Sequence, residues 1–97
     1  MKKVTMFYFP TCPYCAAALN WMAELKAENP DYAKVEVEMI DEKKNPAIAD
    51  QFDYYYVPTF FIDGVKIHEG AATREIVEGV LRRAAGMEGY AREEAVS

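Results

Sequence analysis

The sequence predicts an α/β domain in which a four-stranded mixed sheet is flanked by three helices. Apolar runs and helical repeats alternate along the chain in the order β-α-β-α-β-β-α. The chain has 97 residues, which favours a single domain, and 52% of them are hydrophobic, which argues against disorder. We therefore expect one folded domain over residues 1–86, followed by a polar tail over 87–97.

The first part of the chain predicts a buried strand that leads directly into a helix. Residues 4–9 are apolar apart from one threonine, and the run ends at Pro10. Apolar residues then recur at helical spacing from Cys15 to Leu25. Pro13 suits the first turn of this helix, because its missing N–H leaves no bond unmade there.

A second strand and a short helix are expected next. Asn29 and Pro30 should end the first helix. Alternating apolar and acidic residues over 35–41 predict a strand with one solvated acidic face. An Asn-Pro pair then predicts a short helix over about residues 45–52. Because a helix joins the first two strands, they should run parallel with a right-handed crossover.

The last third of the chain predicts a hairpin and a final helix. Residues 59–62 are apolar or β-branched, and Asp63-Gly64 is a strong signal for a two-residue hairpin turn. Residues 65–67 should therefore pair back antiparallel. A capping threonine predicts the start of the last helix in the segment 73–86, and a glycine predicts its end.

Charge and hydropathy narrow the classes of function. The net charge of -5 weighs against nucleic acid or an anionic membrane as the main partner. No run reaches the roughly 18 apolar residues of a membrane span. The apolar run before Pro10 is too short for a signal peptide. We therefore expect a cytoplasmic, monomeric protein, in which an isolated cysteine pair is more often catalytic or metal-binding than structural.

The chemistry is expected at Cys12-Pro13-Tyr14-Cys15, which follows a strand and opens a helix. Unpaired N–H groups and the helix dipole at that place favour an anion, and hence a thiolate on Cys12. Cys15 lies about one helical turn further on and within reach of Cys12. We predict that Cys12 attacks a substrate disulfide and that Cys15 resolves the mixed disulfide.

Metal binding is the main alternative use of such a cysteine pair. Zinc sites take three or four protein ligands, whereas this chain offers two cysteines and His68. We therefore predict no metal ligands within the chain. A zinc or iron–sulfur site shared between two chains remains open, which would make the protein a metal- or cluster-binding module.

The two anchors Cys12-Pro13-Tyr14-Cys15 and Val57-Pro58 resemble those of a known family. The first resembles the dithiol active site of glutaredoxins, and the second resembles the cis-proline dipeptide that thioredoxins and glutaredoxins share. The resemblance covers residues 4 to about 85 and implies the thioredoxin fold. It further implies that Pro58 packs beside the two sulfurs and that the Val57 backbone binds an extended peptide or glutathione.

Two further residues are predicted to contact the substrate, and they are Thr11 and Tyr14. The resemblance implies reduction of protein disulfides or of mixed disulfides with glutathione. Glutathione is then the expected co-substrate and electron donor, and no cofactor is expected to be bound. The alternative is a thioredoxin-like reductase supplied with electrons by a flavoprotein reductase.

Some positions depart from the glutaredoxin pattern. Glutaredoxins often carry a basic residue three positions before the first cysteine, where this chain has Phe9. Of their Gly-Gly pair only Gly70 remains, and Ala72 or Thr73 stands where they carry an aspartate. Glu69 adds a negative charge where anionic glutathione would dock. These differences favour the thioredoxin-like alternative.

The chain also departs from the thioredoxin pattern. Thioredoxins have Gly-Pro between the cysteines, a tryptophan before them and a buried acid, which here would fall at Met6. The segment Tyr54–Tyr56 has two readings, an aromatic rim for a partner or partial packing in the core. Trp21 is expected to pack against the core.

Overall fold

The computed structural model describes residues 2–86 and confirms the α/β class. The polar tail expected over 87–97 lies outside the described residues. Among the described residues, no helix is both long and apolar enough to cross a membrane. The elements are, in chain order, β1 (Val4–Tyr8), α1 (Pro13–Glu28), α2 (Pro30–Ala33), β2 (Val37–Asp41), α3 (Pro46–Ala49), β3 (Thr59–Ile62), β4 (Val65–Glu69) and α4 (Arg74–Ala84).

The four strands form one mixed sheet in the order β2-β1-β3-β4. β1 and β2 run parallel, with Val4 opposite Val37, as expected for strands joined by a helical crossover. β3 runs antiparallel to β1 and pairs with β4 in the predicted hairpin. Asp63 and Gly64 at its turn both have positive φ, 48° and 84°, which is the backbone of a type I′ turn.

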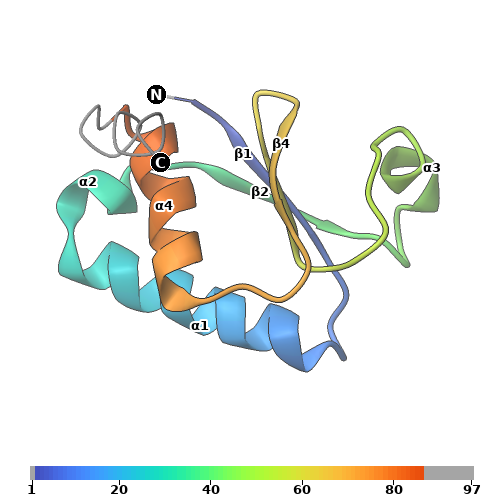
Figure 1. Cartoon of the computed structure of the whole chain (residues 1–97), viewed down its shortest axis with the longest axis horizontal. Coiled ribbons are helices and arrows are strands. Elements are labelled where there is room, and N and C mark those ends of the chain that lie inside the picture. Colours follow the sequence, from blue (N-terminus) through green and yellow to red (C-terminus); the bar gives the residue numbers. More distant parts are fainter. Residues whose placement is uncertain (1, 87–97) are drawn as a thin grey trace, which may run out of the picture.

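The two faces of the sheet carry separate cores. Met6 and Phe7 are neighbours on β1 and point to opposite faces, as a pleated strand requires. Met6 belongs to the larger core, which α1, α2 and α4 cover. Phe7 belongs to the smaller core, where the ring of Phe52 lies 4.8 Å from it, centroid to centroid. Figure 1 shows α1, α2 and α4 on one side of the strands and α3 on the other.

Residues 2–86 form four helices, whereas the sequence predicted three. The additional helix is α2. Asn29 ends α1 in an extended conformation with φ of -134°. Its side chain accepts a hydrogen bond of 2.9 Å from the backbone N–H of Asp31 and so caps α2. Pro30 fills the first position of the new helix, where its missing N–H costs nothing. A helix stop and a helix start therefore coincide at these two residues.

Helix α3 ends at Ala49, whereas the sequence predicted a helix to about Phe52. The N–H groups of Gln51 and Phe52 each donate to the carbonyl three residues earlier, at 3.0 Å. Such bonds belong to tight turns that follow a helix. The chain thus leaves α3 in turns that carry the ring of Phe52 onto the smaller core.

Two strands differ from prediction at one end. β2 begins at Val37 and not at the predicted Val35, and the side chain of Val35 packs in the larger core before the strand starts. β4 runs to Glu69, two residues beyond the predicted Ile67. This longer β4 places Glu69 opposite Thr59 at the start of β3.

Candidate active site

Cys12 lies at the N-cap of α1, just beyond the carboxyl end of β1. Its backbone is extended, and its carbonyl accepts the first helical hydrogen bond from the N–H of Ala16 at 3.1 Å. The N–H of Cys12 donates to the carbonyl of Phe9 at 3.2 Å. Pro13 takes the first helical position, as predicted. The chain therefore turns from strand to helix at the first thiol.

The surroundings of the Cys12 sulfur suit a nucleophile. The residue is 7% exposed, so its sulfur lies close to the surface of the molecule without being fully solvated. The first amides of α1 have no intrahelical partner, and the helix dipole adds positive potential there. Both effects stabilise negative charge that develops near this position. The sulfur also lies 3.9 Å from the carbonyl oxygen of Val57.

Cys15 lies one helical turn inside the molecule and is 2% exposed. Burial raises the pKa of its thiol from 9.0 to about 12, and this outweighs a hydrogen bond with the Phe9 backbone that lowers the pKa. The adjacent Cys12 and the charge of Glu42 raise the pKa further. Both cysteines are free thiols in the structure. Cys15 is therefore a neutral, protected thiol behind a more accessible one.

The Val57–Pro58 peptide bond is cis, as the resemblance implies. Pro58 is buried, and its carbonyl accepts a hydrogen bond of 2.9 Å from the N–H of Gly70. Gly70 has a φ of 93°, a conformation that favours glycine, and a Cβ there would lie 3.8 Å from that of Tyr56. The hydrogen bond between Gly70 and Pro58 holds the end of β4 against the segment that faces Cys12.

Thr11 and Tyr14 lie on the surface on either side of the first thiol. Thr11 is exposed in the turn between β1 and α1. Tyr14 is in the first turn of α1, with 60% of its surface exposed. The role of both residues in binding stays a prediction.

The three consecutive tyrosines divide between core and surface. The ring of Tyr54 stacks on that of Phe7 with centroids 4.7 Å apart, and its hydroxyl donates to Glu42 at 2.8 Å. Tyr55 and Tyr56 are 85% and 69% exposed. Core packing therefore accounts for Tyr54. The other two remain candidates for an aromatic rim.

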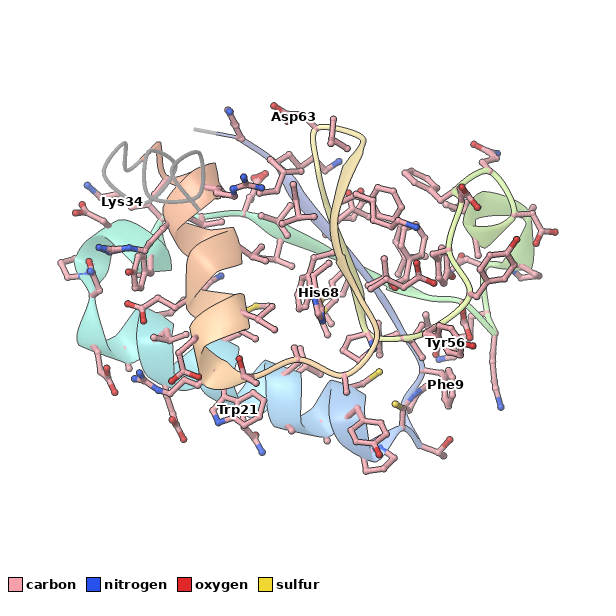
Figure 2. The ribbon with its side chains drawn as sticks, in the orientation of Figure 1. Phe9, Trp21, Lys34, Tyr56, Asp63 and His68 are labelled. Carbon is pink, nitrogen blue, oxygen red and sulfur yellow. The ribbon has the colours of Figure 1, made fainter. Side chains whose placement is uncertain are left out.

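Figure 2 marks the thiol end of the molecule by Phe9 and Tyr56, with Asp63 far away at the hairpin turn. Trp21 lies further along α1 and packs against the larger core, as predicted. The ammonium of Lys43 lies over the ring of Phe9, 4.9 Å from its centroid. Sequence reasoning placed no cation there, because Lys43 follows a different strand and reaches Phe9 only in the folded chain.

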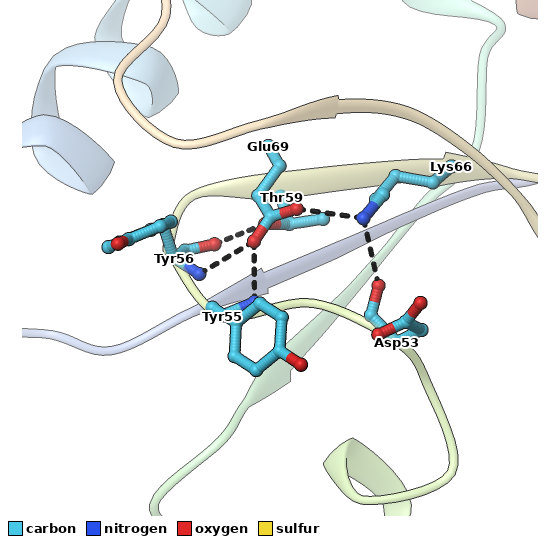
Figure 3. Close-up of polar contacts among 6 residues, drawn as sticks. All are labelled: Asp53, Tyr55, Tyr56, Thr59, Lys66 and Glu69. Carbon is cyan, nitrogen blue, oxygen red and sulfur yellow. Dashed lines mark hydrogen bonds and ion pairs between the residues drawn. The ribbon is translucent and has the colours of Figure 1, made fainter.

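Glu69 has a role that sequence reasoning missed. Its carboxylate accepts hydrogen bonds from the N–H groups of Tyr55 and Tyr56, and it pairs with Lys66 at 2.8 Å (Figure 3). Lys66 and the two amides lower the pKa of Glu69 to about 2. The negative charge that Glu69 was expected to add where glutathione would dock is therefore paired with Lys66. In the sequence, only Lys66, three residues before Glu69, could have indicated that this charge is paired.

Metal ligands do not gather in the part of the chain that the structure describes, residues 2–86. No group of three or more His, Cys, Asp or Glu residues there could hold a metal ion. The Nε2 atom of His68 lies 2.9 Å from the carbonyl oxygen of Ala71. That contact ties the ring to the connection that follows β4.

The fold and the paired thiols define the class of protein, a disulfide oxidoreductase of the thioredoxin superfamily. Its glutaredoxin-like character follows from the comparison with family models. The glutaredoxin model matches residues 4–67, and the chain belongs to the glutaredoxin family.

Similar proteins carry both thioredoxin and oxidoreductase names. A thioredoxin of Methanocaldococcus jannaschii is 39% identical over 82 residues, which cover 84% of this chain and 94% of that protein. The crystal structure of a protein disulfide oxidoreductase from Aeropyrum pernix is 25% identical with a TM-score of 0.59, covering 88% of this chain and 38% of that one. The oxidised thioredoxin of Plasmodium falciparum has a TM-score of 0.67 over 87% of this chain and 81% of its own. At 15% identity, that likeness shows the fold alone.

Proposed function

We propose that this chain reduces disulfide bonds in proteins by thiol–disulfide exchange, with Cys12 as the attacking thiol and Cys15 as the resolving thiol. The contrast between the two thiols carries the proposal. Cys12 lies at a helix N-terminus beside Val57, whereas Cys15 is buried behind it with a pKa of about 12. Exchange needs one reactive thiolate and one thiol held in reserve.

The reaction has two exchange steps. The Cys12 thiolate attacks one sulfur of the substrate disulfide, an S–S bond forms, and the other substrate sulfur leaves as a thiolate. Cys15 then loses its proton and attacks the Cys12 sulfur, and the second substrate sulfur leaves as a thiolate. The Cys12–Cys15 disulfide remains. The substrate has gained two electrons and, after protonation, two protons, and the chain has lost the same.

The substrate is proposed to be an extended polypeptide that lies across Val57 and Pro58. The Val57 backbone would take up the peptide as one more strand, a common mode of peptide recognition. The exposed rings of Tyr14, Tyr55 and Tyr56 would flank it, as aromatic residues do at many interfaces. Thr11 would contact the substrate on the other side of the thiol.

We propose a flavoprotein reductase as the electron donor. The named relative from Methanocaldococcus jannaschii is a thioredoxin. Two positions at which glutaredoxins hold glutathione are also engaged within this chain. The Thr73 hydroxyl accepts a hydrogen bond from the N–H of Ile76 and caps α4. The Glu69 carboxylate is bound to Lys66 and to two amides of the adjacent loop.

Glutathione is the second candidate donor, and Lys43 favours it. Glutaredoxins often place a basic residue three positions before the first cysteine, and the ammonium of Lys43 lies over Phe9 at that position. A cation there could bind a carboxylate of glutathione. Mixed disulfides with glutathione would then be substrates as well.

A comparison of donors tests the proposed function. NADPH oxidation is followed with a protein disulfide as substrate, coupled either to thioredoxin reductase or to glutathione and its reductase. We expect turnover with thioredoxin reductase that exceeds turnover with glutathione. The Lys43→Met substitution should slow the glutathione-fed rate alone, and Lys34→Met, remote from Phe9 in Figure 2, should slow neither.

Two outcomes would contradict the proposal. Turnover with neither donor would exclude disulfide reduction by these two electron supplies. Stoichiometric zinc or iron in the purified protein, detected by metal analysis and visible absorption, would favour the metal-binding alternative.

A further inference from the structure

We propose that Glu69 is a positioning residue that holds the loop before Pro58 and so sets the Val57 carbonyl against the Cys12 thiol for a polypeptide substrate. The inference rests on the proposed function, because it concerns how the same site receives its substrate. Glu69 lies at the end of β4, and its carboxylate would act through the loop and not by contact with the reacting sulfurs.

Glu69 holds the N–H side of the loop. One oxygen of its carboxylate accepts from the N–H groups of both Tyr55 and Tyr56, the latter at 3.0 Å. The other oxygen binds the ammonium of Lys66 at 2.8 Å. Lys66 also donates to the carbonyl of Asp53 at 3.1 Å, at the beginning of the loop (Figure 3). Both carboxylate oxygens are therefore used. Together the two side chains bind three backbone groups of the loop, the carbonyl of Asp53 and the N–H groups of Tyr55 and Tyr56.

Thr59 holds the carbonyl side of the same loop. Its hydroxyl donates to the carbonyl of Tyr56, and the residue is fully buried opposite Glu69 in the β3–β4 pairing. The N–H and the carbonyl of Tyr56 are thus both bound by side chains of the sheet. Val57 follows directly, and its carbonyl lies 3.9 Å from the Cys12 sulfur. A short chain of contacts links Glu69 to the reactive thiol.

Apolar packing cannot hold this part of the loop. The rings of Tyr55 and Tyr56 are mostly exposed and contribute little burial. A segment with few buried contacts opens easily unless polar contacts restrain it. Freedom of the loop would add an ordering cost to substrate binding, which a restrained loop avoids.

Three variants separate this role from a general effect of charge. Glu69→Ala removes both the amide contacts and the ion pair. Lys66→Met removes the ion pair and the hydrogen bond to the Asp53 carbonyl, and it leaves the amide contacts of Glu69 in place. Glu38→Ala is the matched control. It removes the same charge from another ion pair, with Lys3 at 2.9 Å, on the edge strand β2. Each variant is assayed with an extended peptide disulfide and with hydroxyethyl disulfide, which is too small to pair with Val57.

We expect Glu69→Ala to raise KM for the peptide disulfide by about tenfold at nearly unchanged kcat, the pattern of lost binding, since charge-assisted hydrogen bonds are lost. The rate with hydroxyethyl disulfide should not change. Amide hydrogen exchange at Tyr55 and Tyr56 should become faster. Lys66→Met should act in the same direction but less, and Glu38→Ala should match the wild type.

The outcomes distinguish the two proposals. If the wild type reduces both substrates while Glu69→Ala changes neither KM nor amide exchange, the positioning role is overturned and the proposed function stands. Equal losses on both substrates would also overturn it, because they indicate a general structural defect. If the wild type reduces neither substrate, the proposed function fails. Amide exchange at Tyr55 and Tyr56 then shows by itself whether Glu69 holds the loop. Should Glu69→Ala not fold, Glu69→Gln replaces it in the same comparison.

Discussion

Cys15 lies one helical turn behind Cys12, and its sulfur meets almost no solvent. With its pKa raised to about 12, the Cys15 thiol stays almost entirely protonated at neutral pH. Cys12 occupies the helix N-terminus, where unpaired amides favour an anion. Two identical side chains three positions apart are therefore expected to differ strongly in reactivity.

Alkylation tests this difference directly. Iodoacetamide at about pH 8 should modify Cys12 and spare Cys15, because the reagent attacks the thiolate. Mass spectrometry of the digested, reduced protein locates the modification. In the Cys12→Ser control, the remaining thiol should react far more slowly than Cys12 does in the wild type, because burial still raises the pKa of Cys15. Equal modification of both cysteines in the folded protein would contradict the assignment of roles.

The titration of Glu69 reports on its contacts with the loop. Lys66 and two amides lower its pKa from 4.5 to about 2. These contacts therefore contribute stability above about pH 4.5, and it is lost as the pH falls toward 2. An NMR titration should place the Glu69 midpoint near 2, and Lys66→Met should shift it upward. A wild-type midpoint near 4.5 would mean that the contacts do not form in solution.

At the scale of secondary structure, Tyr32 ties α2 to α4. Its ring is buried in the larger core. Its hydroxyl donates to Glu78 at 2.8 Å and accepts from Arg82 at 3.2 Å, both on α4. Burial, together with the Glu78 contact, raises the pKa of Tyr32 from 10.0 to about 12.

Tyr32→Phe should lower the free energy of unfolding by about 1 kcal/mol at neutral pH, because the ring stays and two hydrogen bonds are lost. The folded state keeps the Tyr32 proton up to about pH 12, whereas the unfolded state loses it near pH 10. Stability should therefore fall between these values, and less steeply in the variant. Urea unfolding across this pH range measures the free energy of unfolding of both proteins. If it falls equally steeply with pH in the wild type and in Tyr32→Phe, the prediction is wrong.

Helix α4 depends on its N-cap. The Thr73 hydroxyl accepts the N–H of Ile76 at 3.1 Å. Removing such a cap costs about 1 kcal/mol, so Thr73→Ala should lower the unfolding free energy by that amount, and Thr73→Asp should not. Thermal unfolding of the three proteins measures the effect. An unchanged melting temperature in Thr73→Ala would show that the cap contributes nothing.

Over the whole molecule, the elements that depend on neighbouring residues were predictable. The apolar run of β1, Pro13 at the start of α1 and the Asp63-Gly64 turn all lie where local patterns placed them. Each is determined by residues within a few positions, which sequence patterns can report. The cis bond before Pro58 was expected from resemblance to a family, since X-Pro bonds are far more often trans.

Contacts between distant segments were not predictable in this way. Glu69 reaches Tyr55 and Tyr56 only because β4 is two residues longer than expected and its end lies beside the loop. Lys43 lies in the turn after β2 and reaches Phe9, which follows β1. Such contacts depend on register and loop path, for which the local sequence carries no period or turn signal.

The site forms where three parts of the fold meet, the end of β1, the start of α1 and the loop before β3. Cys12 is supplied by the first two parts and Val57 by the third. In the proposed mechanism, Cys12 attacks a substrate here and Cys15 releases it. A variant without the resolving thiol should therefore stop at the mixed disulfide.

The most direct test incubates reduced Cys15→Ser with a peptide disulfide and measures the intact mass. We expect one half of the peptide disulfide to become covalently attached to Cys12 and to be released by excess reductant. The wild type should carry no adduct and should accumulate the Cys12–Cys15 disulfide, and Cys12→Ser should form no adduct. An absence of adduct on Cys15→Ser, or an equal adduct on Cys12→Ser, would show that the two thiols do not have these roles.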